Sequence, residues 1–272
     1  IKLNLKKITL GRDCRLSSDN LKEGIAEGLL ESGIDIIDLS VVPTPLLYFS
    51  IHHLNTDGGV MITGSHNPPE YNGVKLCIGK STIYGDKIQE IRKICEKENF
   101  VKGKGNYSKA DIVKPYIDYV TQNIQLGDKK IKVVVDAGNG TGGEIACQIL
   151  EKLGISYIPL YCTMDGNFPN HHPDPTISKN LTDCIKTVLS EKADLGVAYD
   201  GDADRIGAVS ENGEIIWGDE LLIIFSREIL SRIPTAIFIS EVKSSQALYD
   251  DLRKHGGQII MWKTGHSLIK NK

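Results

Sequence analysis

A serine in a glycine-punctuated loop is the first group in this chain that could act as a nucleophile. Residues 63–69 (TGSHNPP) directly follow an apolar run over residues 59–62. Gly64 lets the backbone turn sharply before Ser65, and the two prolines prevent a helix from forming at the exit. The segment predicts a serine hydroxyl exposed at the end of a strand, although an ordinary polar turn would show the same pattern.

A second segment, residues 200–205 (DGDADR), supplies three carboxylates at alternate positions: Asp200, Asp202 and Asp204. Alternate residues of an extended loop project to one side, so the three carboxylates can converge. Carboxylates at such short range repel one another unless a cation lies among them, and Mg²⁺ prefers oxygen ligands of this kind. A serine nucleophile and a Mg²⁺ site in one chain indicate phosphate chemistry, whereas a solvated acidic turn is the simpler alternative.

The acidic segment also partly fits a calcium-binding EF-hand loop. Glu211 falls at the twelfth position when Asp200 is counted as the first. The sixth position, however, holds Arg205, where the sharp turn of that loop needs glycine, and both flanks have the pattern of strands. A Ca²⁺-binding module without catalysis is therefore kept only as an alternative.

A glycine-rich segment, residues 138–143 (GNGTGG), favours a different class of function. It fits the G-x-G-x-x-G pattern, follows a predicted strand and opens a predicted helix, and Asp165 lies at a suitable distance for a ribose contact. An NAD-dependent oxidoreductase is therefore a second alternative. Asp136 would set a negative charge beside the pyrophosphate, and such loops also serve as plain strand-to-helix turns.

Other polar side chains follow predicted strands, at the strand ends where ligands bind in α/β folds. Arg15 suits a phosphate because a guanidinium binds oxyanions with two parallel hydrogen bonds, although an ion pair with Asp13 is equally expected. Lys75 lies shortly after the serine segment. Lys243 and residues 263–266 (KTGH) follow two further apolar stretches. Residues 168–175 (FPNHHPDP) contain adjacent histidines among three prolines, which favours a stiff structural loop over a metal site.

The segments that must position these side chains alternate between strand and helix patterns along the chain. Strands are predicted over residues 7–10, 34–39, 59–62, 131–135, 155–161, 194–199, 206–210 and 236–239. Helices are predicted over residues 20–32, 45–54, 85–99, 113–123, 143–153, 180–190, 220–229 and 244–255. This rhythm predicts an α/β fold with parallel or mixed sheets covered by helices, and residues 102–106 have the composition of a linker.

The composition limits the classes of protein that need consideration. A length of 272 residues favours two or more domains, and the hydrophobic content of 40% is that of a globular protein. The net charge of −3 argues against nucleic-acid binding, and no apolar run reaches the length of a membrane span. The start lacks a signal-peptide pattern, and the six cysteines show no zinc spacing, so we expect reduced thiols and a cytoplasmic location.

Taken together, the motifs resemble the signature loops of the α-D-phosphohexomutases. The resemblance rests on residues 63–68, 72–75 (NGVK), 200–205 and 263–266, which occur in the order of the family and span almost the whole chain. Residues 168–175 are similar to the phosphomannomutase/phosphoglucomutase branch. The resemblance implies reversible transfer of phosphate between C1 and C6 of a hexose phosphate (mannose, glucose or both). The implied route runs through a phosphoserine and a hexose 1,6-bisphosphate, which is both intermediate and activator.

The resemblance also implies roles for individual residues in a cleft between tandem mixed-sheet βα domains. Ser65 would carry the phosphate, and a phosphoserine oxygen would join Asp200, Asp202 and Asp204 around Mg²⁺. Lys75 would act as general acid and base. Further catalytic residues would be His66 and Arg15. The residues expected to bind substrate are Arg205, Lys243, Thr264, Gly265 and His266. The partners expected are small sugar phosphates, without nucleic acid or membrane.

Two departures from the family bear on the domain organisation. The family has four domains, and we expect domain I over residues 1–108, domain II over 109–215 and part of domain III over 216–272, with domain IV absent. The segment that normally precedes the first strand is also missing. We therefore expect a fragment of a mutase, able to hold the metal and the phosphoserine but poor in turnover.

Overall fold

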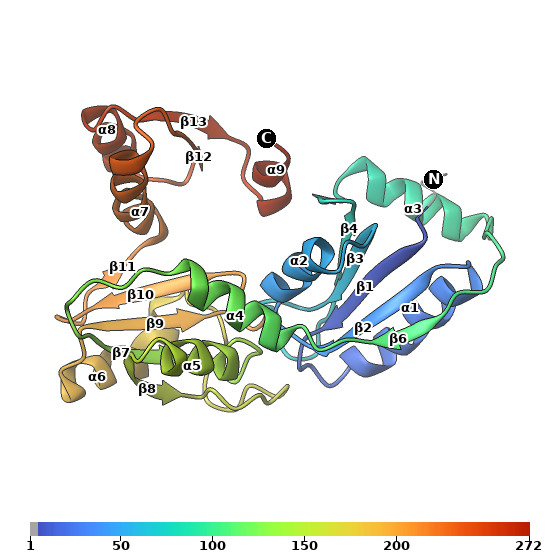
Figure 1. Cartoon of the computed structure of the whole chain (residues 1–272), viewed down its shortest axis with the longest axis horizontal. Coiled ribbons are helices and arrows are strands. Elements are labelled where there is room, and N and C mark those ends of the chain that lie inside the picture. Colours follow the sequence, from blue (N-terminus) through green and yellow to red (C-terminus); the bar gives the residue numbers. More distant parts are fainter. Residues whose placement is uncertain (1–4) are drawn as a thin grey trace. The chain divides into compact units, whose positions relative to one another are not determined.

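The computed structural model describes residues 5–272 and divides the chain into two compact units (Figure 1). The first unit runs to Glu214 and the second from Ile215 to Lys272. Among the residues described, no helix combines the length and the apolar character that a membrane crossing requires.

The first sheet of the first unit has the strand order β5-β4-β3-β1-β2-β6. Its strands are β1 (Lys7–Arg12), β2 (Asp35–Val41), β3 (Gly58–Ile62), β4 (Val74–Ile78), β5 (Ser81–Thr82) and β6 (Tyr107–Lys109). Strand β1 pairs in parallel with β2 and β3, whereas β4 is antiparallel to β3. All five residues of β3 are buried, as expected for a central strand covered on both faces.

Helices α1 (Ser18–Glu31) and α2 (Thr44–His53) cover opposite faces of this sheet. Ala26 of α1 packs with Ile8 and Leu10 of β1, whereas Leu46 and Leu47 of α2 pack against Met61 of β3 and its neighbours. The alternation of side chains along each strand produces these two separate clusters. Helix α3 (Asp86–Glu96) buries none of its residues.

A second sheet in the same unit contains the strand order β10-β9-β7-β8. Its strands are β7 (Lys132–Asp136), β8 (Ser156–Leu160), β9 (Leu195–Tyr199) and β10 (Ile206–Ser210). Strand β7 is parallel to β8 and β9, and β10 is antiparallel to β9. The helices that accompany it are α4 (Val113–Asn123), α5 (Gly143–Lys152), the 3-10 turn η1 (Ser178–Leu181) and α6 (Thr182–Glu191).

One hydrophobic cluster joins the two sheets of the first unit. It contains Leu46 and Met61 from the first sheet and its helix α2, Ile117 from α4, and Ile145 from α5. Because these side chains are buried together, the loops at the carboxyl ends of the two sheets are held in a defined relation to each other. The backbone of Thr44 accordingly donates to the carbonyl of Asp202 at 2.9 Å.

The second unit has a smaller sheet of two parallel strands, β12 (Ile237–Glu241) and β13 (Gln258–Trp262). Helices α7 (Gly218–Arg232) and α8 (Gln246–Lys254) pack with it through Leu230, Phe238, Leu248 and Leu252. The short strand β11 (Ile215–Ile216) opens the unit and α9 (His266–Asn271) ends it.

The α/β class, the mixed sheets and each of the longer predicted elements are confirmed, with ends displaced by a few residues. The short strands β5, β6 and β11 and the helix α9 were not predicted. Two or three residues carry no periodicity, and β6 follows directly on the stretch predicted as a linker. Strand β6 exists because it pairs with β2, where Tyr107 lies opposite Ile36.

The packing of α2 on the first sheet leads to a prediction for stability. Leu47 has none of its surface exposed, so the Leu47→Ala substitution should lower the free energy of unfolding by about 2–5 kcal/mol through lost burial and a cavity. Leu126→Ala, at a half-exposed position, is the matched control and should change it by less than about 0.5 kcal/mol. Urea unfolding measures both, and equal effects would contradict this account of the core.

Candidate active site

The serine loop (residues 63–73) and the acidic loop (residues 200–205) meet in the first unit. The Ser65 hydroxyl donates to Asp200 Oδ2 at 2.7 Å, although the two residues are 135 positions apart. Gly201 also lies against the loop, because a Cβ atom on it would come within 2.5 Å of the Ser65 carbonyl oxygen. The structure thus brings together the two segments from which the sequence predicted a site.

Ser65 adopts a left-handed backbone conformation with φ of 50°. This conformation costs an L-residue roughly 1–2 kcal/mol, so the surrounding contacts must hold it. The Ser65 amide donates to Thr63 Oγ1 at 2.8 Å, and the Ser65 carbonyl accepts from Arg15 Nη2 at 2.8 Å. Gly64 is required before it, because a Cβ there would lie 2.5 Å from the guanidinium carbon of Arg15.

Arg15 does not have the position expected of a phosphate ligand. Its side chain has none of its surface exposed and forms a buried ion pair with Asp13, so the expected pair exists but not at the surface. The guanidinium is enclosed by the serine loop instead of facing the space beside Ser65. The guanidinium is thus directed at the backbone of the serine loop, and a contact of Arg15 with the transferred phosphate stays a prediction.

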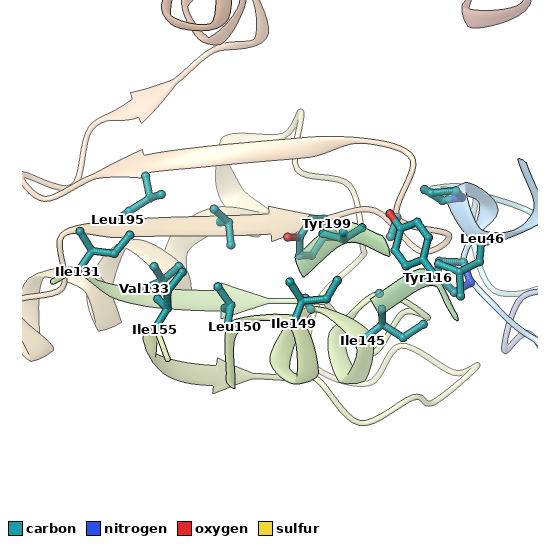
Figure 2. A pocket seen from close by; sticks show the side chains of 17 residues that line it. Leu46, Tyr116, Ile131, Val133, Ile145, Ile149, Leu150, Ile155, Leu195 and Tyr199 are labelled. Atoms are coloured by element: carbon teal, nitrogen blue, oxygen red, sulfur yellow. The ribbon is translucent and has the colours of Figure 1, made fainter. Parts of the chain in front are cut away.

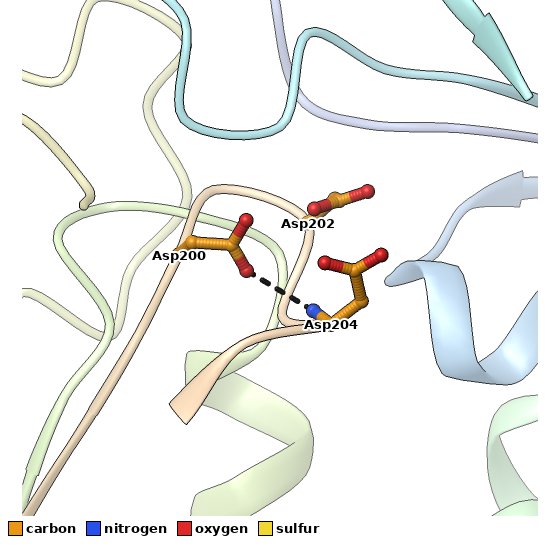
Figure 3. A group of neighbouring side chains, drawn as sticks. All are labelled: Asp200, Asp202 and Asp204. Atoms are coloured by element: carbon orange, nitrogen blue, oxygen red, sulfur yellow. Dashed lines mark hydrogen bonds between the residues drawn. The ribbon is translucent and has the colours of Figure 1, made fainter. Parts of the chain in front are cut away.

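The acidic loop is a tight turn between the antiparallel strands β9 and β10 (Figure 3). One oxygen from each of Asp200, Asp202 and Asp204 lies within 4.8 Å of the others. Asp200 Oδ1 accepts from the amides of Asp204 at 3.0 Å and Arg205 at 3.1 Å, which curls the turn around the carboxylates. Because both flanks are strands, the EF-hand alternative is wrong.

The acidic loop fits a divalent cation. Within the described part of the chain, Asp202 Oδ1 is buried and has no hydrogen-bond partner. Burial of an unpaired carboxylate oxygen is costly unless a cation coordinates it. Burial and the neighbouring charge of Asp202 raise the pKa of Asp200 to about 7. Burial also acts to raise the pKa of Asp202, but the charge of Lys75 outweighs it and lowers that pKa overall. Asp202 is therefore the charged neighbour of Asp200, and a cation among the carboxylates would relieve this repulsion.

Lys75 reaches the same carboxylates from the first sheet. Strand β4 pairs with β3 so that Lys75 lies opposite Met61, and its ammonium donates to Asp202 Oδ2 at 2.5 Å and Asp204 Oδ2 at 2.7 Å. Burial lowers the pKa of Lys75, but the charges of Asp202 and Asp204 outweigh it and raise that pKa overall. Lys75 therefore stands protonated beside the acidic loop.

His66 and Arg205 add further nitrogen groups beside Ser65. The Arg205 guanidinium contacts the His66 ring, and burial followed by the charge of Arg205 lowers the pKa of His66. A neutral imidazole thus follows Ser65 in the chain, and a partly exposed guanidinium lies against that imidazole. Asp174 of the proline loop (residues 168–175) interacts electrostatically with both groups.

The glycine loop (residues 138–143) supports the acidic loop and has no free face for a dinucleotide. All six residues are buried. Thr141 donates to the Gly201 carbonyl through its amide at 3.0 Å and its hydroxyl at 3.1 Å, and a Cβ on Gly140 would lie 2.8 Å from that oxygen. The glycines allow two backbones to approach closely, so this geometry does not fit the NAD alternative.

The proline loop braces the other side of the glycine loop. His171 Nε2 lies 3.0 Å from Asp136 Oδ1, and Pro173 packs against Gly138. Burial lowers the pKa of His171, but the hydrogen bond and charge of Asp136 outweigh it, so that pKa is raised overall. His171 is therefore a structural residue of this loop, as the sequence indicated.

Sequence reasoning missed the contribution of Thr44 to the site. Its hydroxyl donates to Asp202 Oδ2 at 2.5 Å from the first turn of α2. A threonine after a proline at a helix start is also what ordinary helix initiation requires, so its residue type carried no functional signal.

Four predicted substrate-binding residues lie in the second unit. Lys243 follows β12, and Thr264, Gly265 and His266 follow β13. Because β12 and β13 are parallel, both segments lie at the same carboxyl edge of their sheet. Lys243 is largely exposed there and pairs with Glu241 at 3.0 Å.

An apolar cavity of about 380 Å³ lies between α4, α5 and the face of β7 and β9 (Figure 2). Its lining contains aliphatic side chains with Tyr116 and Tyr199, and no charged residue. A phosphorylated sugar needs cationic or hydrogen-bonding groups, so this cavity does not fit the chemistry predicted for the site.

Comparison with family models decides the classification of the chain. Three successive α/β/α domain models of phosphoglucomutase/phosphomannomutase match it: domain I over residues 2–102, domain II over residues 114–213 and domain III over residues 217–272. The chain belongs to the phosphoglucomutase/phosphomannomutase family. The order of the three matches agrees with the order of the motifs along the sequence.

Individual members of the phosphoglucomutase/phosphomannomutase family support this placement. A phosphomannomutase/phosphoglucomutase of Pseudomonas aeruginosa is 46% identical over 97% of this chain and 57% of its own length. The crystal structure of a family protein from Burkholderia thailandensis superposes with a TM-score of 0.94 at 40% identity, covering 98% of this chain and 60% of that one. The chain thus spans less than two thirds of the length of these relatives.

A more distant likeness concerns the fold alone. An N-acetylphosphoglucosamine mutase from Aspergillus fumigatus, crystallised with GlcNAc-6P and magnesium, has a TM-score of 0.58 at 14% identity. The superposition covers 97% of this chain and 45% of the Aspergillus fumigatus chain.

The raised pKa of His171 leads to a prediction of pH-dependent stability. Because the folded pKa lies above the ordinary 6.5, the stabilisation from the Asp136 pair is complete below 6.5 and is lost as pH rises through the folded pKa. The difference in unfolding free energy between the wild type and His171→Gln should therefore shrink as pH rises across that window. Urea unfolding at several pH values measures it.

His52→Gln, at an exposed histidine, is the control and should show a difference from the wild type that does not follow this trend. A wild-type advantage over His171→Gln that stays constant or grows with pH would contradict the assignment of the raised pKa.

Proposed function

We propose that the protein catalyses reversible phosphoryl transfer between C1 and C6 of a hexose phosphate, mannose or glucose, through a phosphoserine and a hexose 1,6-bisphosphate. The observation that carries this proposal is the contact of the Ser65 hydroxyl with Asp200, with Lys75 on the neighbouring carboxylates. Membership of the phosphoglucomutase/phosphomannomutase family supports the reaction class.

In this proposal the phosphorylated Ser65 transfers its phosphoryl group to a sugar hydroxyl, which gives the hexose 1,6-bisphosphate. The Ser65 hydroxyl then accepts a phosphoryl group back from the bisphosphate. Phosphoryl transfer needs an aligned nucleophile and compensation of the charge on the transferring oxygens. The left-handed turn at Ser65 and its contact with Asp200 support alignment. The cationic Lys75 binds the carboxylates of the acidic loop, and Arg205 contacts His66, the residue after Ser65. Lys75 is the candidate to exchange a proton with the sugar hydroxyl.

A Mg²⁺ ion would be held by Asp200, Asp202 and Asp204 with an oxygen of the phosphorylated Ser65. When bound, the ion would neutralise charge on the phosphoryl oxygens. Two observations support the site: the unpartnered Asp202 Oδ1 and the raised pKa of Asp200. The presence of magnesium with the distant Aspergillus fumigatus relative is in line with this choice of metal.

The remaining groups are assigned to the substrate. In the first unit, Arg205 would bind a phosphate of the sugar through its guanidinium. In the second unit, Lys243, Thr264, Gly265 and His266 stay predicted substrate-binding residues, since an exposed cation and a glycine turn at strand ends suit an oxyanion. The proposal includes a reducing, cytoplasmic setting, which rests on the spacing of the six cysteines in the sequence.

The proposal predicts a phosphate adduct on Ser65. After incubation with a hexose 1,6-bisphosphate and Mg²⁺, the wild-type chain should gain the mass of one phosphoryl group, located at Ser65 by peptide mapping. Ser65→Ala should gain none and should keep its unfolding temperature, whereas the control Ser190→Ala should behave like the wild type. Phosphorylation of Ser65→Ala to the same extent would remove the serine from the mechanism.

A further prediction concerns the metal. Asp202→Asn removes a buried ligand charge and should weaken Mg²⁺ or Mn²⁺ binding at least about 100-fold in calorimetric titrations. Asp128→Asn, at an exposed aspartate, should bind the metal like the wild type. Without metal, Asp202→Asn should unfold at a lower temperature, because Lys75 and Thr44 lose a buried charged acceptor. Unchanged metal affinity in this variant would place the ion elsewhere.

A further inference from the structure

Arg15 occupies the interior of the serine loop with every donor used. A guanidinium has five N–H groups. The five acceptors are Asp13 Oδ2 at 3.1 Å, the carbonyl oxygens of Pro68 at 2.5 Å and Tyr71 at 3.0 Å, and those of Ser65 at 2.8 Å and Asn67 at 2.7 Å. No donor is left for a substrate, and the side chain has no exposed surface.

We propose that Arg15 is a positioning residue: it holds the serine loop in the conformation that aims the Ser65 hydroxyl at the acidic loop. The inference deepens the function proposed above and rests on it for its catalytic consequence. It differs from a role as phosphate ligand, because the contacts of Arg15 run to the backbone of the loop.

Asp13 fixes the guanidinium from behind. Its Oδ1 accepts from the Arg15 amide at 3.0 Å and the Ser18 hydroxyl at 2.5 Å. Its Oδ2 accepts from Arg15 Nε and from the Gly64 amide at 3.0 Å. The carboxylate therefore ties the guanidinium both to the end of β1 and to the start of the serine loop. The hydrogen bonds to both side chains offset the desolvation cost of this buried ion pair, which an isolated buried charge would bear in full.

The loop needs the shape of arginine as well as its charge. Four carbonyl oxygens converge on the two terminal nitrogens, and a planar fork can serve all of them. A lysine ammonium has three donors on one atom, so buried carbonyls would be left without partners. The ring of Phe168, from the proline loop, lies 5.1 Å from the guanidinium carbon and closes the remaining side.

Three hydrogen bonds fix the position of Ser65, and the catalytic consequence of losing Arg15 follows from them. Its amide is held by Thr63, its carbonyl by Arg15 and its hydroxyl by Asp200. Loss of the Arg15 anchor would let the left-handed residue relax toward a common conformation and turn the hydroxyl away. A displacement of about 1 Å at a reacting group can cost 10²-fold in rate.

The test uses the full 272-residue chain with Arg15→Ala. Phosphoryl uptake on Ser65 from a hexose 1,6-bisphosphate, followed by intact mass, should slow about 100-fold. In the unphosphorylated chain, Mg²⁺ affinity should stay within about threefold, since Arg15 contacts none of the three aspartates of the acidic loop. Guanidinium chloride at about 20 mM should raise the uptake rate of Arg15→Ala at least about tenfold, because the ion can occupy the space left by the side chain. Urea at the same concentration has a similar shape without the charge and should restore none.

A second readout is independent of phosphoryl transfer. Amide hydrogen exchange of residues 64–72 should accelerate about tenfold or more in Arg15→Ala and slow again with guanidinium, while exchange of residues 195–199 should not change. Arg15→Lys should resemble Arg15→Ala, and Arg92→Ala, at an exposed arginine, should match the wild type in both measurements.

Three results would overturn the inference: uptake in Arg15→Ala within threefold of the wild type, rescue by urea as effective as that by guanidinium, or unchanged exchange in the serine loop. If the wild type itself takes up no phosphate, the proposed function fails, and the exchange measurement still decides the role of Arg15.

Discussion

The contact between the Ser65 hydroxyl and the Asp200 carboxylate is the interaction on which the site depends. The two residues come from different sheets and are 135 positions apart, so neither loop can form the site alone. Their meeting requires the two sheets of the first unit to pack as one body. The shared cluster of Leu46, Met61 and Ile145 does this through apolar burial, a non-directional force that is nevertheless specific once the side chains interdigitate.

The charge balance of the acidic loop imposes a second constraint. Asp200 and Asp202 are buried, and their mutual repulsion must be offset by hydrogen-bond donors and a cation. The donors come from three directions: Ser65, Lys75 and Thr44. The first unit thus assembles most of a cation site from neutral and cationic groups, and Asp202 Oδ1 is the atom that they leave unsatisfied.

Close backbone approach is the third requirement, and glycine meets it. Gly64 leaves room for the Arg15 guanidinium, and Gly140 leaves room for the backbone of Gly201. The acidic loop thus packs on the glycine loop through Gly201 and contacts the serine loop through Asp200. These supports explain why segments far apart in the sequence, each resembling a separate binding motif, belong to one site.

The sequence by itself determined the α/β class, the main helices and strands, and the identity of the serine and acidic loops. These signals are local: periodicity reports the exposed face of an element, and glycine, proline and carboxylates report turns and ligand chemistry at short range. The short strand β6 was missed because it exists only by pairing with β2.

Tertiary structure alone decided what the ambiguous motifs do. The glycine-rich pattern at residues 138–143 is compatible with a cofactor until the acidic loop is seen packed on it. Arg15 has the residue type of a phosphate ligand, and only the folded chain shows four carbonyl oxygens of the serine loop around it. The physical reason is the same in both cases: the partners of a backbone or guanidinium group are chosen by non-local packing, which no local pattern of residues encodes.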